Sequence, residues 1–301
     1  CEIDGFRDRH PNQFLSMGMA EQNMMSFAGG LGLAGFRPFI HTFGVFTYRR
    51  PYDQLIASII YPRRKVRIMG FLPGITTPGG MTHQAIDDIS VMRTLPNMTV
   101  LETGDATEVE SICEAADKID GPVYCRILRG AVPRLFDTPL KVGKIRKLSD
   151  GHDILVVTSG IATEEALRAS ASLKKAGVSI KHIHLNTLKP IEENEISEHV
   201  QSVKYGVVSL ENHLVNGGIG SIIAEIIAKF GISKKLIKLG LQDTFAHGGS
   251  KPYLMKYYGL DAYTLIKSIE KLIDQKININ ESDLDNVRIE DVHSLSKEEA
   301  L

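Results

Sequence analysis

The sequence predicts an α/β protein made of two consecutive doubly wound domains, each with a mostly parallel sheet. Short runs rich in apolar and β-branched residues alternate with amphipathic stretches, which is the pattern of parallel strands connected by helices. The alternation occurs twice, and a polar stretch containing Pro139 and Gly143 interrupts it. We therefore expect a first domain at residues 1–137, a linker at 138–150, a second domain at 151–275 and a polar tail at 276–301.

In the first domain, apolar runs alternate with segments of helical periodicity. The basic residues 63–65 between two of these elements fit a solvated loop better than a site for a phosphate backbone. The expected strands are residues 13–16, 37–42, 66–71, 98–102 and 123–128, and the expected helices are 20–33, 51–59, 84–93 and 106–116.

The second domain repeats this alternation, and the polar composition after residue 275 ends it. The tail is expected to be mobile or a helical appendage. The expected strands are residues 154–158, 180–185, 206–210 and 235–239, and the expected helices are 163–176, 218–230 and 262–274.

The start of the chain does not look like the start of an α/β domain. It opens at Cys1 with a charged segment, whereas such a domain normally begins with a buried strand. We therefore expect that a first strand and helix of this domain are missing from the sequence given.

Charge and composition narrow the classes of partner. A formal net charge of -1 gives no overall attraction to nucleic acid or to anionic lipid. No stretch has the roughly 20 apolar residues that span a bilayer. The three cysteines have no metal-ligand spacing and are expected to be reduced thiols. We expect a cytoplasmic protein without a metal site of its own.

Glu21 is the first candidate for a chemical role. It follows a glycine turn and lies in the first turn of an expected helix made mostly of small and apolar residues. The glycines of that helix would let another helix or subunit approach closely. An acid at a helix N-terminus also interacts favourably with the helix dipole, so Glu21 alone does not establish a catalytic site.

The segment around Glu21 is the first in a series of motifs that occur in a fixed order. The motifs occupy residues 16–23, 37–46, 52–55, 80–89, 93–100, 104–108, 186–191, 211–213, 217–221 and 258–260. With these motifs the sequence resembles the transketolase family, over its pyrimidine-binding and C-terminal domains and over nearly all of the chain before the tail.

The resemblance implies a thiamine diphosphate enzyme that transfers a two-carbon ketol unit from a ketose phosphate to an aldose phosphate. In that family a carboxyl group hydrogen-bonds the cofactor's pyrimidine ring and promotes its activation, and Glu21 matches that residue. Phe43 and Phe46 match an aromatic wall against the pyrimidine, although their spacing also fits ordinary core packing. Tyr48 is a further candidate for that wall.

Two residues match substrate contacts in the family. His83 corresponds to a histidine that faces the substrate carbonyl or the developing hydroxyl, and an imidazole can deliver a proton near neutral pH. Arg129 corresponds to an arginine that binds the substrate phosphate, where a guanidinium can make bidentate contacts. His213, in the second domain, is expected to serve subunit packing at most.

The sequence departs from the family pattern at two positions in the sugar channel. Gly79 stands where typical members have an aspartate that contacts a sugar hydroxyl, and Phe71 stands where many have a basic phosphate ligand. These changes favour a branched or otherwise unusual ketose phosphate, of the apulose-4-phosphate type.

The Gly-Asp-Gly motif that marks the diphosphate-binding domain of these enzymes is absent. Magnesium, which bridges diphosphate oxygens to protein ligands, would therefore be held by another polypeptide. The resemblance implies a split transketolase, a heterotetramer of two such N-terminal subunits and two copies of this chain, which self-associates through both of its domains.

Three alternatives remain open at this point. The β subunit of a 2-oxoacid dehydrogenase E1 component has the same two domains, but Thr82-His83-Gln84 and residues 93–97 favour a sugar enzyme. A fragment of a deoxyxylulose-phosphate synthase is the second. A non-catalytic paralogue is the third, and the presence of Glu21 argues against it.

Overall fold

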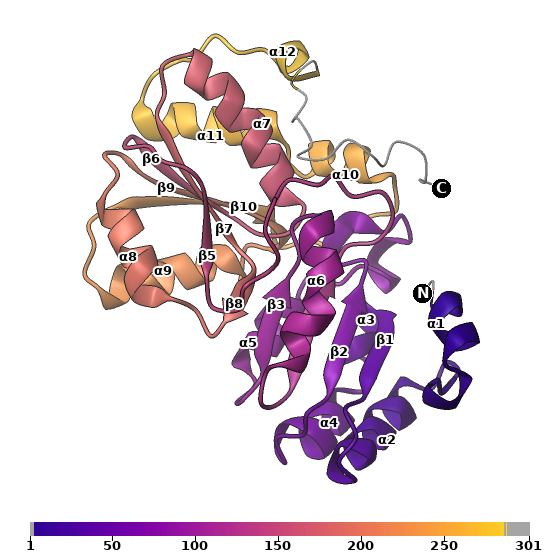
Figure 1. Ribbon diagram of the computed structural model, residues 1–301. Coiled ribbons are helices and arrows are strands. Elements are labelled where there is room, and N and C mark those ends of the chain that lie inside the picture. Colours follow the sequence, from indigo (N-terminus) through magenta and orange to yellow (C-terminus); the bar gives the residue numbers. More distant parts are fainter. Residues whose placement is uncertain (1–2, 286, 288–301) are drawn as a thin grey trace.

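The computed structural model describes residues 3–285 and 287, and it has two α/β domains side by side (Figure 1). The expected fold class is confirmed. The strands of the first sheet lie in the order β1-β2-β4-β3-β8, and those of the second in the order β10-β9-β6-β7-β5. All neighbouring pairs are parallel except β3–β8 and β5–β7.

The strands of both sheets carry apolar side chains, because helices cover the sheets and remove them from water. In the first domain the strands are β1 (Phe39–Phe43), β2 (Arg67–Phe71), β3 (Thr99–Glu102) and β4 (Val123–Ile127). In the second half of the chain they are β5 (Ile145–Ser149), β6 (Ile154–Thr158), β7 (Ile180–Leu185), β8 (Thr187–Lys189), β9 (Gly206–Leu214) and β10 (Lys235–Leu241).

Helices flank the two sheets. Those of the first domain are α1 (Asp4–Arg9), α2 (Glu21–Leu33), α3 (Gly44–Tyr48), α4 (Tyr52–Leu55), α5 (Asp88–Thr94) and α6 (Ala106–Asp117), and α4 continues as a π-helical turn at Ile56–Ile60. In the second domain α7 (Ala162–Lys175) and α11 (Ala262–Ile273) cover one face of the sheet and α8 (Glu193–Gln201) and α9 (Ile219–Lys229) the other (Figure 1). The remaining helices are α10 (Lys251–Tyr257) and α12 (Glu281–Asp285).

Two expected elements at the domain boundaries need correction. Residues 13–16 form no strand; Pro11–Gln13 is a short 3-10 turn and residues 14–16 are irregular, without a strand beside them. Residues 145–149, placed in the expected linker, form β5 at the edge of the second sheet. As an edge strand β5 is only partly buried, which explains why its sequence is as polar as a linker.

The beginning of the expected polar tail is part of the second domain. Ile277, Ile279 and Leu284 are buried and belong to the same apolar cluster as the side chains of α7 and α11. The described part of this segment is therefore packed, because its few apolar side chains face the domain. Residues 286 and 288–301, also assigned to the tail, lie outside the described residues.

One apolar core joins the two domains. It runs from Met25 and Ile68 in the first domain to Leu185 and Ile219 in the second. Strand β8, which follows β7 of the second domain, pairs with β3 of the first. The two domains are thus joined by a shared apolar core and by a strand that extends the first sheet.

Candidate functional site

Glu21 is the first residue of α2, and its carboxylate is almost buried, with 8% of the residue exposed. Its Oε1 accepts a hydrogen bond of 2.8 Å from Nη1 of Arg50. The guanidinium of Arg50 also lies over the ring of Phe46, with its central carbon 4.0 Å from the ring centroid. Glu21, Arg50 and Phe46 therefore form one contacting group, built from the start of α2 and from α3 with the turn that follows it.

Three rings adjoin this group. Phe43 ends β1, and α3, which begins at the next residue, carries Phe46; the two phenyl rings stack with centroids 6.0 Å apart. The imidazole of His83 meets both rings edge-on, with centroids 6.0 Å from that of Phe43 and 5.5 Å from that of Phe46. The structure thus brings together Phe43, Phe46 and His83, and Arg50, which contacts both Phe46 and Glu21, links them to the carboxylate.

The residues of this group fit the pyrimidine ring of thiamine diphosphate. A flat group that stacks on Phe46 and donates a hydrogen bond from nitrogen to Glu21 is what an aminopyrimidine offers, and the planar guanidinium of Arg50 makes these same two contacts. The sequence did not predict a role for Arg50, because nothing in its local pattern reveals a contact with a residue 29 positions earlier.

Tyr48 is placed differently from the two phenylalanines. It is 2% exposed, packs in the core, and its hydroxyl donates to Asp87. Burial, with the nearby charges of Asp88 and Asp87, raises the pKa of Tyr48 far above its usual value. Arg49 also binds Asp87, at 2.7 Å, and the carbonyl of Met81 at 3.0 Å. Tyr48 and Arg49 thus hold the segment around His83 instead of lining the aromatic wall.

Arg129 lies outside the group formed by Glu21, the phenylalanines and His83. It follows β4 and lines a cavity of about 210 Å³ between the two domains. Lys251 from the second domain lines the same cavity, as do Thr76 and Glu164. The cavity thus combines two basic side chains, Arg129 and Lys251, with the acidic Glu164.

Two buried charge networks link the two domains, and the sequence alone does not predict either of them. Arg126 is fully buried on β4; it donates to Asp88 at 2.7 Å and pairs with Glu102, to which Ser159 of the second domain also donates. Tyr124 donates to the same Asp88 oxygen at 2.6 Å. These residues belong to segments with ordinary strand and helix periodicity, and the periodicity does not predict which charged side chains pair.

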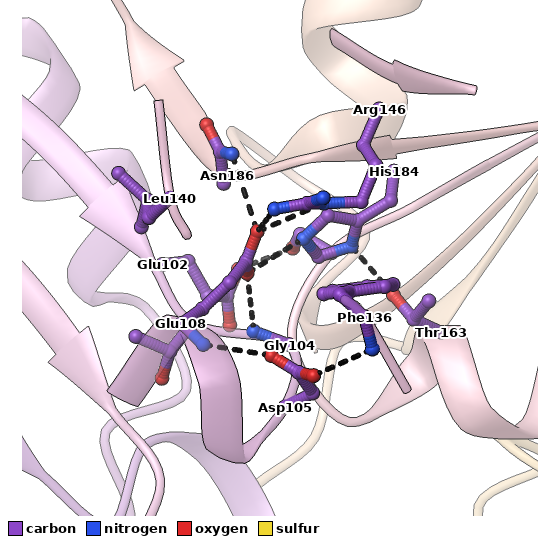
Figure 2. Close-up of polar contacts among 12 residues, drawn as sticks. Glu102, Gly104, Asp105, Glu108, Phe136, Leu140, Arg146, Thr163, His184 and Asn186 are labelled. Carbon is purple, nitrogen blue, oxygen red and sulfur yellow. Dashed lines mark hydrogen bonds and ion pairs between the residues drawn. The ribbon is translucent and has the colours of Figure 1, made fainter. Parts of the chain in front are cut away.

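The second network connects α6 to the second domain (Figure 2). Glu108 accepts from the backbone N–H of Gly104 at 2.9 Å, and it contacts His184 at 3.0 Å and Arg146 at 3.1 Å. Burial alone would raise the pKa of Glu108, but His184, the Gly104 N–H and Arg146 together lower it to about 2. Glu108 is therefore ionised and joins the domains electrostatically.

Among the described residues, no group of three or more His, Cys, Asp or Glu side chains is arranged to hold a metal ion. In the part of the chain that the structure describes, no helix combines the length and the apolar character needed to cross a membrane.

Comparison with known families gives the same two domains. The model of the transketolase pyrimidine-binding domain matches residues 3–134, and that of the transketolase C-terminal domain matches residues 143–265.

The chain belongs to the transketolase family.

Its relatives include a transketolase family protein of Sinorhizobium fredii, 36% identical over 91% of this chain and 81% of that protein. A protein named as a transketolase C-terminal section, from Methanocaldococcus jannaschii, is 35% identical over 88% of this chain and 84% of its own. A 6-deoxy-6-sulfo-D-fructose transketolase subunit of a Clostridium species is 33% identical over 91% of this chain and 85% of its own.

Longer relatives and solved structures agree with this assignment. The 1-deoxy-D-xylulose-5-phosphate synthase of Syntrophotalea carbinolica is 30% identical, and this chain spans 43% of it. A split-gene transketolase solved as an inactive β4 tetramer superposes with a TM-score of 0.82 at 34% identity, over 92% of this chain and 90% of that one. The transketolase of Campylobacter jejuni, with a TM-score of 0.68 at 19% identity over 85% of this chain and 39% of its own, shares the fold.

Proposed function

We propose that this chain supplies the pyrimidine-binding half of a thiamine-diphosphate-dependent ketol-transfer site, as one subunit of a split transketolase. The observation that carries the proposal is the almost buried carboxylate of Glu21 beside Phe46, with one planar cation already bridging the two. When bound, the cofactor supplies the nucleophilic carbon for transfer. Glu21 hydrogen-bonds its pyrimidine ring, Phe43 and Phe46 stack against that ring, and His83 faces the substrate.

The diphosphate half of the site, with its Mg²⁺, belongs in this proposal to an N-terminal partner subunit. Two relatives, one named as a transketolase subunit and one as a transketolase C-terminal section, support this division. The split-gene relative that forms a β4 tetramer and is inactive in that form supports both self-association and the need for a partner. The assembly proposed is a heterotetramer with two copies of each subunit, working in the cytoplasm.

The substrate is proposed to be a sugar with an anionic terminal group. Arg129, beside Lys251 in the interdomain cavity, is the residue proposed to bind that anion. Gly79 and Phe71 leave the sugar channel without two polar contacts of typical members, which supports an unusual or branched ketose phosphate such as apulose 4-phosphate. The relative named for 6-deoxy-6-sulfo-D-fructose supports the same departure from common pentose phosphates.

The partner requirement is tested by titrating thiamine diphosphate and Mg²⁺ into the isolated chain and into its complex with a subunit carrying Gly-Asp-Gly, by calorimetry. We expect tight binding only in the complex. Tight binding to the isolated chain would contradict the division of the site.

The substrate is tested by measuring ketol transfer by the complex from xylulose 5-phosphate, apulose 4-phosphate and 6-deoxy-6-sulfofructose to one aldose phosphate. A preference for either unusual donor is expected. Ordinary transketolase rates with xylulose 5-phosphate and ribose 5-phosphate would contradict the substrate proposal, and decarboxylation of a 2-oxoacid instead would contradict ketol transfer itself.

A further inference from the structure

His83 lies on an irregular segment of the first domain, residues 72–87, which connects β2 to α5 and is called here the His83 loop. Such a loop has few backbone partners of its own and must be fixed by its surroundings to hold a side chain in place. Short 3-10 turns at Gly74–Thr76 and Gly80–Thr82 are its regular parts. Its position relative to Phe43 and Phe46 therefore depends on what it packs against.

The second domain contacts the His83 loop through the side chain of Asn212. This residue lies on β9, is 2% exposed, and its side-chain amide binds the start of the His83 loop twice. Its Oδ1 accepts from the N–H of Ile75 at 2.9 Å, and its Nδ2 donates to the carbonyl of Pro73 at 3.0 Å. A side-chain amide can satisfy one backbone donor and one backbone acceptor in this way. The amide of Asn212 therefore fixes the start of the loop as a neighbouring strand would, through a pair of hydrogen bonds to its backbone.

The residue between these two contacts shows how close the approach is. Gly74 has a φ of +57°, and a Cβ there would lie 2.1 Å from Oδ1 of Asn212. Only glycine leaves room for the amide, and only glycine adopts this φ without strain. On the other side, the backbone carbonyl of Asn212 accepts from Nη2 of Arg126 at 3.1 Å, which ties Asn212 to the buried charge network.

The C-terminal part of the His83 loop is also fixed by the second domain. The N–H of Leu214, two residues after Asn212, donates to the carbonyl of Ile86 at 2.8 Å. The amide of Gln84, which directly follows His83 and is fully buried, donates to the carbonyl of Thr77 at 3.2 Å and to that of His247 at 3.3 Å. The second domain thus contacts the loop before and after His83.

We propose that Asn212 is a positioning residue for His83, and that the second domain thereby sets how the substrate is held. The family resemblance marked residues 211–213 but gave Asn212 no role, and the contacts assign one to it. The inference rests on the proposed role of His83 at the ketol-transfer site. Asn212 itself touches none of Glu21, Phe43, Phe46 and His83 in the described contacts, so it acts through the loop.

The first test needs only this chain. Hydrogen exchange of peptides covering residues 72–87 is compared in the wild type, in Asn212→Ala and in Arg146→Gln. The control variant removes another interdomain contact, the pairing with Glu108, and touches no residue of the loop. We expect exchange at the loop to become at least about tenfold faster in Asn212→Ala, because the Ile75 N–H loses its acceptor, and to stay unchanged in Arg146→Gln.

Loop exchange that matches the wild type in Asn212→Ala, or that rises equally in both variants, would overturn the proposal. If Asn212→Ala does not fold, Asn212→Asp replaces it. Asp keeps the acceptor for the Ile75 N–H and loses the donor to Pro73, so we expect protection at Ile75 with faster exchange at the rest of the loop; unchanged exchange throughout would overturn the proposal equally.

The second test uses the complex with the partner subunit. Asn212→Ala is expected to lower kcat/KM for the ketose donor about tenfold, while the exchange rate of the cofactor's C2 proton, which depends on Glu21, stays within about twofold of the wild type. An equal loss in both measurements would indicate general disruption and overturn the positioning role. If the wild-type complex transfers no ketol group at all, the proposed function fails, and the loop exchange still decides whether Asn212 holds the loop.

Discussion

Phe46 and Tyr48 are two residues apart on α3, yet their surroundings differ. Phe46 stacks on Phe43 and on the guanidinium of Arg50, whereas the hydroxyl of Tyr48 is hydrogen-bonded to Asp87 inside the fold. We predict that Phe46→Leu raises the Kd of the complex for thiamine diphosphate about 5- to 10-fold, because a stacked aromatic pair contributes roughly 1 kcal/mol beyond its buried area.

The matched variant is Tyr48→Phe, which removes a hydrogen bond but leaves the ring. It is expected to lower the free energy of unfolding by about 1–2 kcal/mol and to leave cofactor affinity unchanged. Calorimetry and urea unfolding of both variants check this pair. A weaker affinity in Tyr48→Phe than in Phe46→Leu would show that Tyr48, as the family resemblance first implied, belongs to the wall.

Arg126 is a fully buried cation that pairs with two buried carboxylates, those of Asp88 and Glu102. Replacing it by Met would leave Asp88 and Glu102 buried without their cation, since both are at most 1% exposed. We expect Arg126→Met to lower the free energy of unfolding by about 3–5 kcal/mol.

Arg134 offers the control, because its partner Glu110 is 65% exposed and lies outside the core. Arg134→Met should cost less than about 1 kcal/mol. Urea denaturation of the two variants measures both values, and similar small losses in both would mean that the buried network does not stabilise the fold.

The sequence could indicate candidate site residues where they belong to a recognisable motif. Glu21 was expected in the first turn of a helix and is the first residue of α2. Phe43 and Phe46 were picked out by the resemblance and their rings stack, while their contact with a cofactor stays a prediction. The convergence of His83 on those rings could not be derived from periodicity, because more than 35 residues separate them in sequence. The role of Arg50 could not be predicted for the same reason, because its contact with Glu21 depends on how the turn after α3 packs against the start of α2.

At the scale of elements, the C-terminal end of β9 joins the domains and is sensitive to acid. Burial lowers the pKa of His213 to about 4, and its Nδ1 donates to the carbonyl of Leu214 at 2.7 Å. The ring is therefore neutral in the fold, whereas in the unfolded chain it takes up a proton near pH 6.5. Stability is lost as the pH falls through the unfolded pKa, because the unfolded state binds the extra proton.

We predict that His213 lowers the free energy of unfolding by about 2 kcal/mol between pH 7 and pH 5, and that His213→Gln removes this share of the pH dependence. Urea unfolding at the two pH values checks it. His182, whose pKa burial lowers to about 3, contributes a similar share and remains in the variant. An identical loss in the wild type and His213→Gln would contradict the assignment to His213.

Elements with a clear period were predictable, and those set by tertiary contacts were not. Residues 20–33 and 262–274 were expected helices and match α2 and α11 closely. Strand β5 was hidden because an edge strand can be polar, and β8 because three residues give no period. The buried end of the expected tail was missed because Ile277, Ile279 and Leu284 are spaced irregularly among polar residues.

At the scale of the whole molecule, the two domains form one structure. They share an apolar core, a strand of one completes the sheet of the other, and buried charges link them. The proposed site uses this arrangement: the first domain carries the carboxylate and the aromatic rings, and the second holds the loop that presents His83. What this chain lacks, in the proposal, is the subunit that binds the diphosphate.

The most direct measurement of the central claim is the exchange of the C2 proton of thiamine diphosphate with deuterium, followed by NMR in the reconstituted complex. Glu21→Ala removes the carboxyl group that the proposal places on the pyrimidine ring, with assembly checked by sedimentation. We predict that the exchange rate falls by at least about 100-fold while the complex still forms, as expected for loss of acid–base assistance. Exchange at the wild-type rate in an intact Glu21→Ala complex would contradict it.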